Sequence, residues 1–126
     1  MEFTEATRAL SARLAAEDDD LAAAGAVYLA VAAWKAVSGE DTSAWDRFGL
    51  EMLDVQARFY GDDQVEVDAT VPGGDRPQVR TAVADLIVHL ARHHDRKANA
   101  SGNDLARRLD HDAAAEQLRR AAAALA

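Results

Sequence analysis

Hydrophobic side chains recur every three or four residues along most of this chain, the spacing that places them on one face of an α-helix. The pattern predicts four main helices and a further helical segment, over residues 4–16, 21–37, 43–60, 77–97 and 104–126. The third helix shows it most clearly, with large apolar side chains at Trp45, Phe48, Met52, Val55 and Phe59. We therefore expect an all-α fold, a four-to-five-helix bundle in a single domain over 1–126.

The run from Leu21 to Trp34 contains no charged side chain, and its apolar residues point in every direction around a helix axis. It is shorter than the roughly 20 residues that cross a bilayer, and acids and Lys35 flank it closely. A helix without a polar face must be enclosed by other protein. We expect this helix at the centre of the core or in the interface of an oligomer.

The hydrophobic period changes to two between residues 61 and 77, where Val65, Val67, Ala69 and Val71 alternate with polar residues. A lone strand cannot satisfy its own backbone hydrogen bonds. Two structures remain open: an extended arm that lies on the helices, or a strand that pairs with the same segment of a second copy. We favour an extended arm over 61–77, between the third and fourth helices.

The C-terminal segment over 99–126 is harder to interpret. Leu105 and Leu109 begin a helical stripe, but Leu118 and Leu125 fall on a different face of any continuous helix. The pattern leaves open one helix or two, and we favour a break near Asp110. On this interpretation the segment is a helical extension that projects from the bundle.

Alanine supplies about half of the apolar residues, and there is no cysteine. Alanine favours helices but buries little area, so the core is thin and a second copy would enlarge it. We expect a non-enzymatic interaction module that pairs with itself and with another protein. The apolar side chains predicted to form the interface are Leu21, Val27, Tyr28, Val31, Val65, Val67, Leu118 and Leu125.

The net charge of −8 is unevenly distributed, because residues 1–76 hold 16 acids and only 6 bases. An acidic front half disfavours nucleic acids and anionic membranes as partners. The absence of cysteine suits a reducing compartment, and the chain does not begin with a basic region followed by an apolar run. We therefore expect a cytoplasmic protein.

The fourth helix carries the main candidates for chemistry. His89 and His93 are four residues apart and share a face, and Asp85 lies one turn earlier, as ligands of one metal would. However, the three spread from the edge of the apolar stripe towards solvent, and no other helix offers a matching histidine–carboxylate pair. We predict no metal, no cofactor and no catalytic residue. A metal or small-ligand site at Asp85, His89 and His93, conceivably an enzyme's, is the alternative function.

Two further clusters have simple structural explanations. The acidic run Glu17–Asp20 can cap the following helix, and it lacks the ligand spacing and glycine of a calcium loop. The tail loosely resembles a helix-turn-helix, with basic residues at Arg107, Arg108, Arg119 and Arg120. Its second helix would begin Ala-Ala-Ala-Glu, which leaves few side chains to read bases. DNA binding is therefore a second, weaker alternative.

Overall fold

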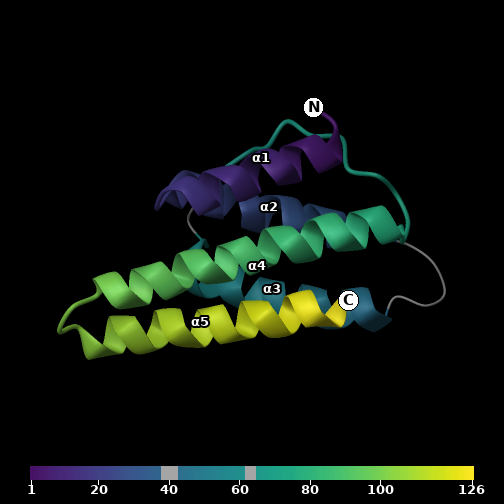
Figure 1. The fold of residues 1–126 in the computed structure, drawn as a ribbon. Helices are drawn as coiled ribbons and strands as arrows, with labels where there is room; N and C mark the ends of the chain where they lie inside the picture. The colour runs from purple at the N-terminus through teal and green to yellow at the C-terminus, as the bar shows by residue number, and fades with distance from the viewer. Residues whose placement is uncertain (38–42, 62–64) are drawn as a thin grey trace.

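The computed structural model describes residues 1–37, 43–61 and 65–126. These residues form five helices and no strand, so the all-α prediction is confirmed. The helices are α1 (Phe3–Ala16), α2 (Asp20–Ala36), α3 (Ser43–Phe59), α4 (Pro77–Ala100) and α5 (Leu105–Ala124). In Figure 1, α4 crosses the middle of the bundle, with α1 on one side of it and α5 on the other. Contacts run in a ring from α1 through α4, α5, α3 and α2 back to α1, and α2 also contacts α4.

The largest buried side chains come from α3 and from the start of α1, and they include Trp45, Phe48 and Phe3. Helix α2 supplies mainly alanines to the same core. The absence of a side chain at Gly49 lets α3 pack closely against Trp34 of α2. A Cβ added at Gly49 would lie 2.2 Å from the Trp34 ring. The indole Nε1 of Trp34 donates to Asp46 Oδ1 at 3.4 Å, which fixes the ring there.

Helix α2 is not enclosed on every side. Leu21 is 62% exposed and Tyr28 is 41% exposed, so one stripe of the helix faces outward. Val27 and Val31 are buried within the single chain instead. The prediction that these two valines form an interface is therefore wrong, because α1, α3 and α4 already surround their face of the helix.

Helix α5 is one continuous helix that packs along α4 and α3, so it neither breaks near Asp110 nor projects from the bundle. Leu118 and Leu125 are core residues of the single chain, which corrects their assignment to an interface. The leucines that suggested the first stripe, Leu105 and Leu109, are exposed. The buried face of α5 is formed mainly by alanines, which make a weak signal in the sequence.

The described part of the segment between α3 and α4 contains no helix or strand, apart from an isolated parallel bridge between Glu2 and Thr70. Val65, Val67, Ala69 and Val71 are half-buried and alternate with exposed polar residues. Residues 62–64 of the predicted arm lie outside the described part of the chain, and pairing with a second copy remains a prediction.

Asp75 fastens the end of this segment to the bundle. It accepts a hydrogen bond from Trp45 Nε1 at 2.9 Å and two from the Arg80 guanidinium at 2.6 Å. The Arg80 hydrogen bonds, followed by that from Trp45, lower the pKa of Asp75 to about 2. The carboxylate therefore stays charged and holds the entry of α4 against α3.

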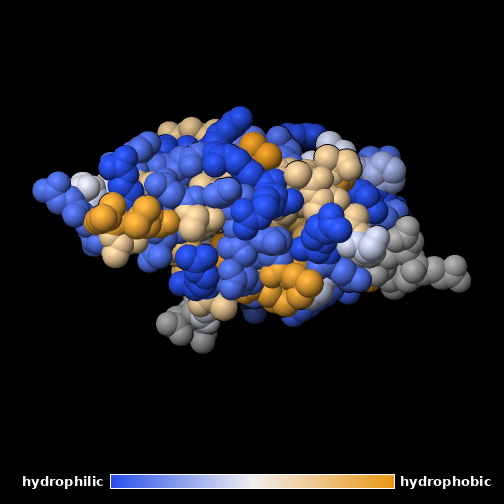
Figure 2. Space-filling view, turned by 90° about the horizontal axis from the view of Figure 1, so that it is seen from below, coloured by the Kyte–Doolittle hydropathy of each residue, from blue (hydrophilic) through white to orange (hydrophobic). Residues whose placement is uncertain are grey.

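The face of the molecule drawn in Figure 2 is mostly hydrophilic. Its hydrophobic patches are separated by hydrophilic side chains. The exposed leucines of the described residues are Leu21, Leu50, Leu53, Leu105 and Leu109. Among the described helices, none has the length and apolar character needed to cross a membrane.

Candidate metal and ligand site

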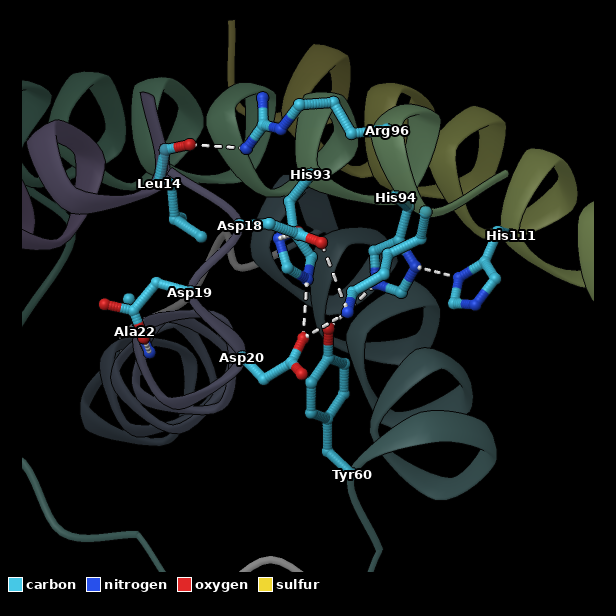
Figure 3. A network of polar contacts seen from close by, with 11 residues as sticks. Leu14, Asp18, Asp19, Asp20, Ala22, Tyr60, His93, His94, Arg96 and His111 are labelled. Carbon is cyan, nitrogen blue, oxygen red and sulfur yellow. Dashed lines mark hydrogen bonds and ion pairs between the residues drawn. The ribbon is translucent and has the colours of Figure 1, made fainter. Parts of the chain in front are cut away.

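The turn between α1 and α2 is held against α4 by several polar contacts, which Figure 3 shows. Asp19 caps α2 by accepting a hydrogen bond from the Ala22 amide at 2.9 Å, as the sequence predicted for this acidic run. Arg13 pairs with the same carboxylate at 2.7 Å. Arg96 of α4 donates to the Leu14 carbonyl at the end of α1. This anchoring places the two neighbouring aspartates, one on each side of Asp19, over α4.

Those aspartates meet His93 and Lys97, which lie one turn apart on α4. Nδ1 of His93 is 2.9 Å from Asp18 Oδ1, and its Nε2 is 3.5 Å from Asp20 Oδ1. The Lys97 ammonium is 3.3 Å from Asp18 Oδ2 and 2.9 Å from Asp20 Oδ1. Figure 3 shows the carboxylates of Asp18 and Asp20 close to the His93 ring. We call these four residues the acid–histidine cluster.

The protonation states of the cluster suit a cation. Burial lowers the pKa of His93, although Asp18 and Asp20 act in the opposite direction. The hydrogen bond from Lys97 lowers the pKa of Asp20. At neutral pH the cluster therefore offers an uncharged imidazole and a charged carboxylate, the forms that bind metal ions.

One ligand atom from each of Asp18, Asp20 and His93 can be chosen so that all three lie within 4.8 Å of one another. Atoms bound to one metal ion at about 2.1 Å lie roughly 3–4 Å apart, so small rotations of the exposed aspartates would close the site. The His93 ring is only 2% exposed, and its Nδ1 makes no geometrically valid hydrogen bond within the described chain. A buried ring nitrogen without such a bond is costly unless another partner, such as a cation, uses it.

A second polar network lies next to the cluster, on α4, α5 and the end of α3. Nε2 of His94 is 2.8 Å from the Tyr60 hydroxyl, and its Nδ1 is 2.9 Å from Nδ1 of His111. Burial, followed by the neighbouring His93 and His111, lowers the pKa of His94 to about 3. Burial also lowers the pKa of His111. Both rings are therefore neutral at neutral pH.

Two tautomer patterns satisfy this network. In the first, the Tyr60 hydroxyl donates to Nε2 of His94, and Nδ1–H of His94 donates to His111. In the second, Nδ1–H of His111 donates to His94, and Nε2–H of His94 donates to Tyr60. The first pattern leaves Nε2–H of His111 available as a donor.

An open pocket of about 440 Å³ joins the cluster to this network. Side chains of both line it, together with Arg107 of α5. Its apolar lining residues are Leu21, Ala24, Phe59 and Val65. This size lies within the range of small-molecule pockets, about 300–1,000 Å³.

In the structure the three predicted ligands do not lie together: His89 contacts Asp85, and His93 contacts other residues. Nδ1–H of His89 donates to the Asp85 carbonyl at 2.9 Å, and the Asp85 carboxylate lies 3.7 Å away. His93 turns instead towards Asp18 and Asp20, so the predicted set of Asp85, His89 and His93 does not form one site. The spacing of four between His93 and Lys97, and the acidic run itself, were the signals for the observed cluster.

Residues 110–112 are helical, whereas the DNA-binding alternative requires a turn there. No protein-family model, curated protein or solved structure matches this chain. What the chain binds must therefore be inferred from its own side chains.

Proposed function

We propose that this protein is a helical-bundle protein that binds one divalent transition-metal ion through Asp18, Asp20 and His93. The observation that supports this is the convergence of a buried imidazole and two carboxylates from separate elements, with donor atoms within 4.8 Å. The turn that carries the aspartates is itself held in place, so the ligands are largely preorganised.

The donor set indicates the class of metal. One imidazole nitrogen and two carboxylate groups suit zinc, manganese or iron. Calcium prefers six to eight oxygen ligands and avoids nitrogen, so it fits the cluster poorly. Waters or a ligand in the adjoining pocket would complete the coordination.

Calorimetric titration with zinc tests the proposal. We expect wild-type protein to bind about one equivalent, and Asp20→Asn to weaken binding at least about tenfold, because a neutral amide replaces a charged ligand. Asp20 is exposed, so this variant should fold. His89→Gln is the matched control, since it removes a histidine of the same helix outside the cluster. Absence of zinc binding, or equal binding by Asp20→Asn and wild type, would contradict the proposal.

Lys97 provides a second test, because its ammonium occupies the space between the two carboxylates that a metal ion needs. A metal must displace this internal cation. Lys97→Gln should therefore bind zinc more tightly, by about tenfold, since like charges a few ångströms apart repel. If the cluster served only as a set of salt bridges, the same variant would be less stable and would bind no metal.

Self-association is a second candidate function, and the exposed stripe on α2 supports it. Leu21 and Tyr28 are seven residues apart, which places them on the same side of the helix, and both are exposed. Val65 and Val67, half-buried beside this stripe, would extend the surface. We propose a homodimer in which the α2 stripes of two copies meet, to be tested by sedimentation.

A further inference from the structure

We infer that the pocket beside the acid–histidine cluster binds the phosphate group of a small phosphorylated molecule, which contacts the metal ion and Arg107 together. This inference rests on the proposed metal site and identifies the class of ligand that the site accepts.

The charges around the pocket change when a metal enters. Without metal, the positive charges of Lys97 and Arg107 match the negative charges of Asp18 and Asp20. Lys97 is engaged by both aspartates, whereas Arg107 has no ion-pair partner in the described part of the chain. A divalent ion adds two positive charges and releases Lys97 from the carboxylates. The loaded pocket then has an excess of positive charge that an anion would neutralise.

The donors favour a phosphate over a carboxylate. The metal ion, Lys97, Arg107 and the Nε2–H of His111 would approach a bound anion from several sides. A phosphate offers three strong acceptor oxygens and close to two negative charges, whereas a carboxylate offers two oxygens and one charge. His111 presents this Nε2–H in the first of the two tautomer patterns, in which the Tyr60 hydroxyl donates to His94 and His94 donates to His111.

The remaining walls indicate what the phosphate is attached to. Leu21, Ala24, Phe59 and Val65 are the apolar side chains that line the same pocket. These side chains would contact an apolar or aromatic portion of the ligand. Phenyl phosphate combines the two features and is therefore a suitable probe.

The test titrates phenyl phosphate into protein that carries one equivalent of zinc, with no excess metal, and into metal-free protein. We expect phenyl phosphate to bind the zinc-loaded protein. Its affinity for the metal-free protein should be at least about tenfold lower, because the ion supplies most of the positive charge. Arg107→Gln should weaken binding by about tenfold, as expected for loss of a charge-assisted contact. Arg108→Gln, a neighbouring exposed arginine outside the pocket lining, should bind as wild type does. Benzoate should bind more weakly than phenyl phosphate.

The outcomes separate the two proposals. If zinc binds but phenyl phosphate binds neither form, or benzoate binds as tightly, the phosphate inference is wrong and the metal site stands. If Arg107→Gln and Arg108→Gln behave alike, the inference is also wrong, because binding then depends only on general surface charge. If zinc does not bind, both proposals fail, whatever phenyl phosphate does.

Discussion

His94 is 1% exposed, and both of its ring nitrogens take part in hydrogen bonds with Tyr60 and His111. Adding a proton would place a positive charge in a buried position, close to His93 and His111. This is why burial lowers its pKa to about 3, and why His93 and His111 shift in the same direction. Three neighbouring histidines that resist protonation make this end of the bundle sensitive to acid.

The free energy of unfolding should therefore fall as the pH is lowered. Below the unfolded pKa of about 6.5, His94 is protonated in the unfolded chain but stays neutral in the folded protein until the pH approaches about 3. Lowering the pH from about 7 to about 5 should therefore reduce the free energy of unfolding by about 2 kcal/mol through His94 alone. Urea unfolding at several pH values measures the loss, and proton NMR follows the His94 ring. A His94 ring that titrates near its ordinary pKa would contradict this explanation.

At the scale of elements, large apolar side chains at helical spacing predicted α1, α3 and α4, and the uncharged apolar run predicted α2, although α4 continues to Ala100, three residues beyond its predicted end. The sequence did not predict α5 as one helix, because its buried face is formed by His111, Ala114, Ala115, Leu118, Ala121 and Ala122, with Leu125 buried at its C-cap. Alanine is compatible with both a core and a surface, so Leu105 and Leu109 dominated the pattern although they are exposed. Which alanines are buried depends on the neighbouring helices and cannot be derived from periodicity.

The alanine face of α5 gives a direct test of this packing. Ala115 is fully buried against the bundle, so Ala115→Leu forces extra volume into a closed core and should cost about 1–3 kcal/mol. Ala113→Leu is the matched control, because Ala113 is exposed on the same helix and its change should stay within about 0.5 kcal/mol. Chemical denaturation of both variants measures the difference. Equal stabilities would mean that α5 does not pack through this face.

At the scale of the whole molecule, the candidate site depends on contacts that local sequence does not encode. The acidic run and the histidines of α4 could each be recognised, but more than seventy positions separate Asp18 from His93. Their meeting depends on the α1–α2 turn crossing α4 near its C-terminal half, which the Arg96 contact to Leu14 helps to fix. Asp85 and His89, two turns and one turn before His93, stay outside the site because the α1–α2 turn does not reach them.

The whole molecule also determines how two copies would meet. Each copy carries a net charge of −8, so copies repel one another at low ionic strength, while contact between the α2 stripes is apolar. Raising the salt concentration shortens the Debye length from about 30 Å at 0.01 M to about 10 Å at 0.1 M. Dimerisation, measured by sedimentation equilibrium, should therefore strengthen with salt. Tyr28→Gln should weaken it, whereas Leu109→Gln, at an exposed leucine of α5 outside the stripe, should not. A monomer at every salt and protein concentration would exclude the dimer. Association that weakens with salt would show that charged groups, and not the α2 stripe, hold the copies together.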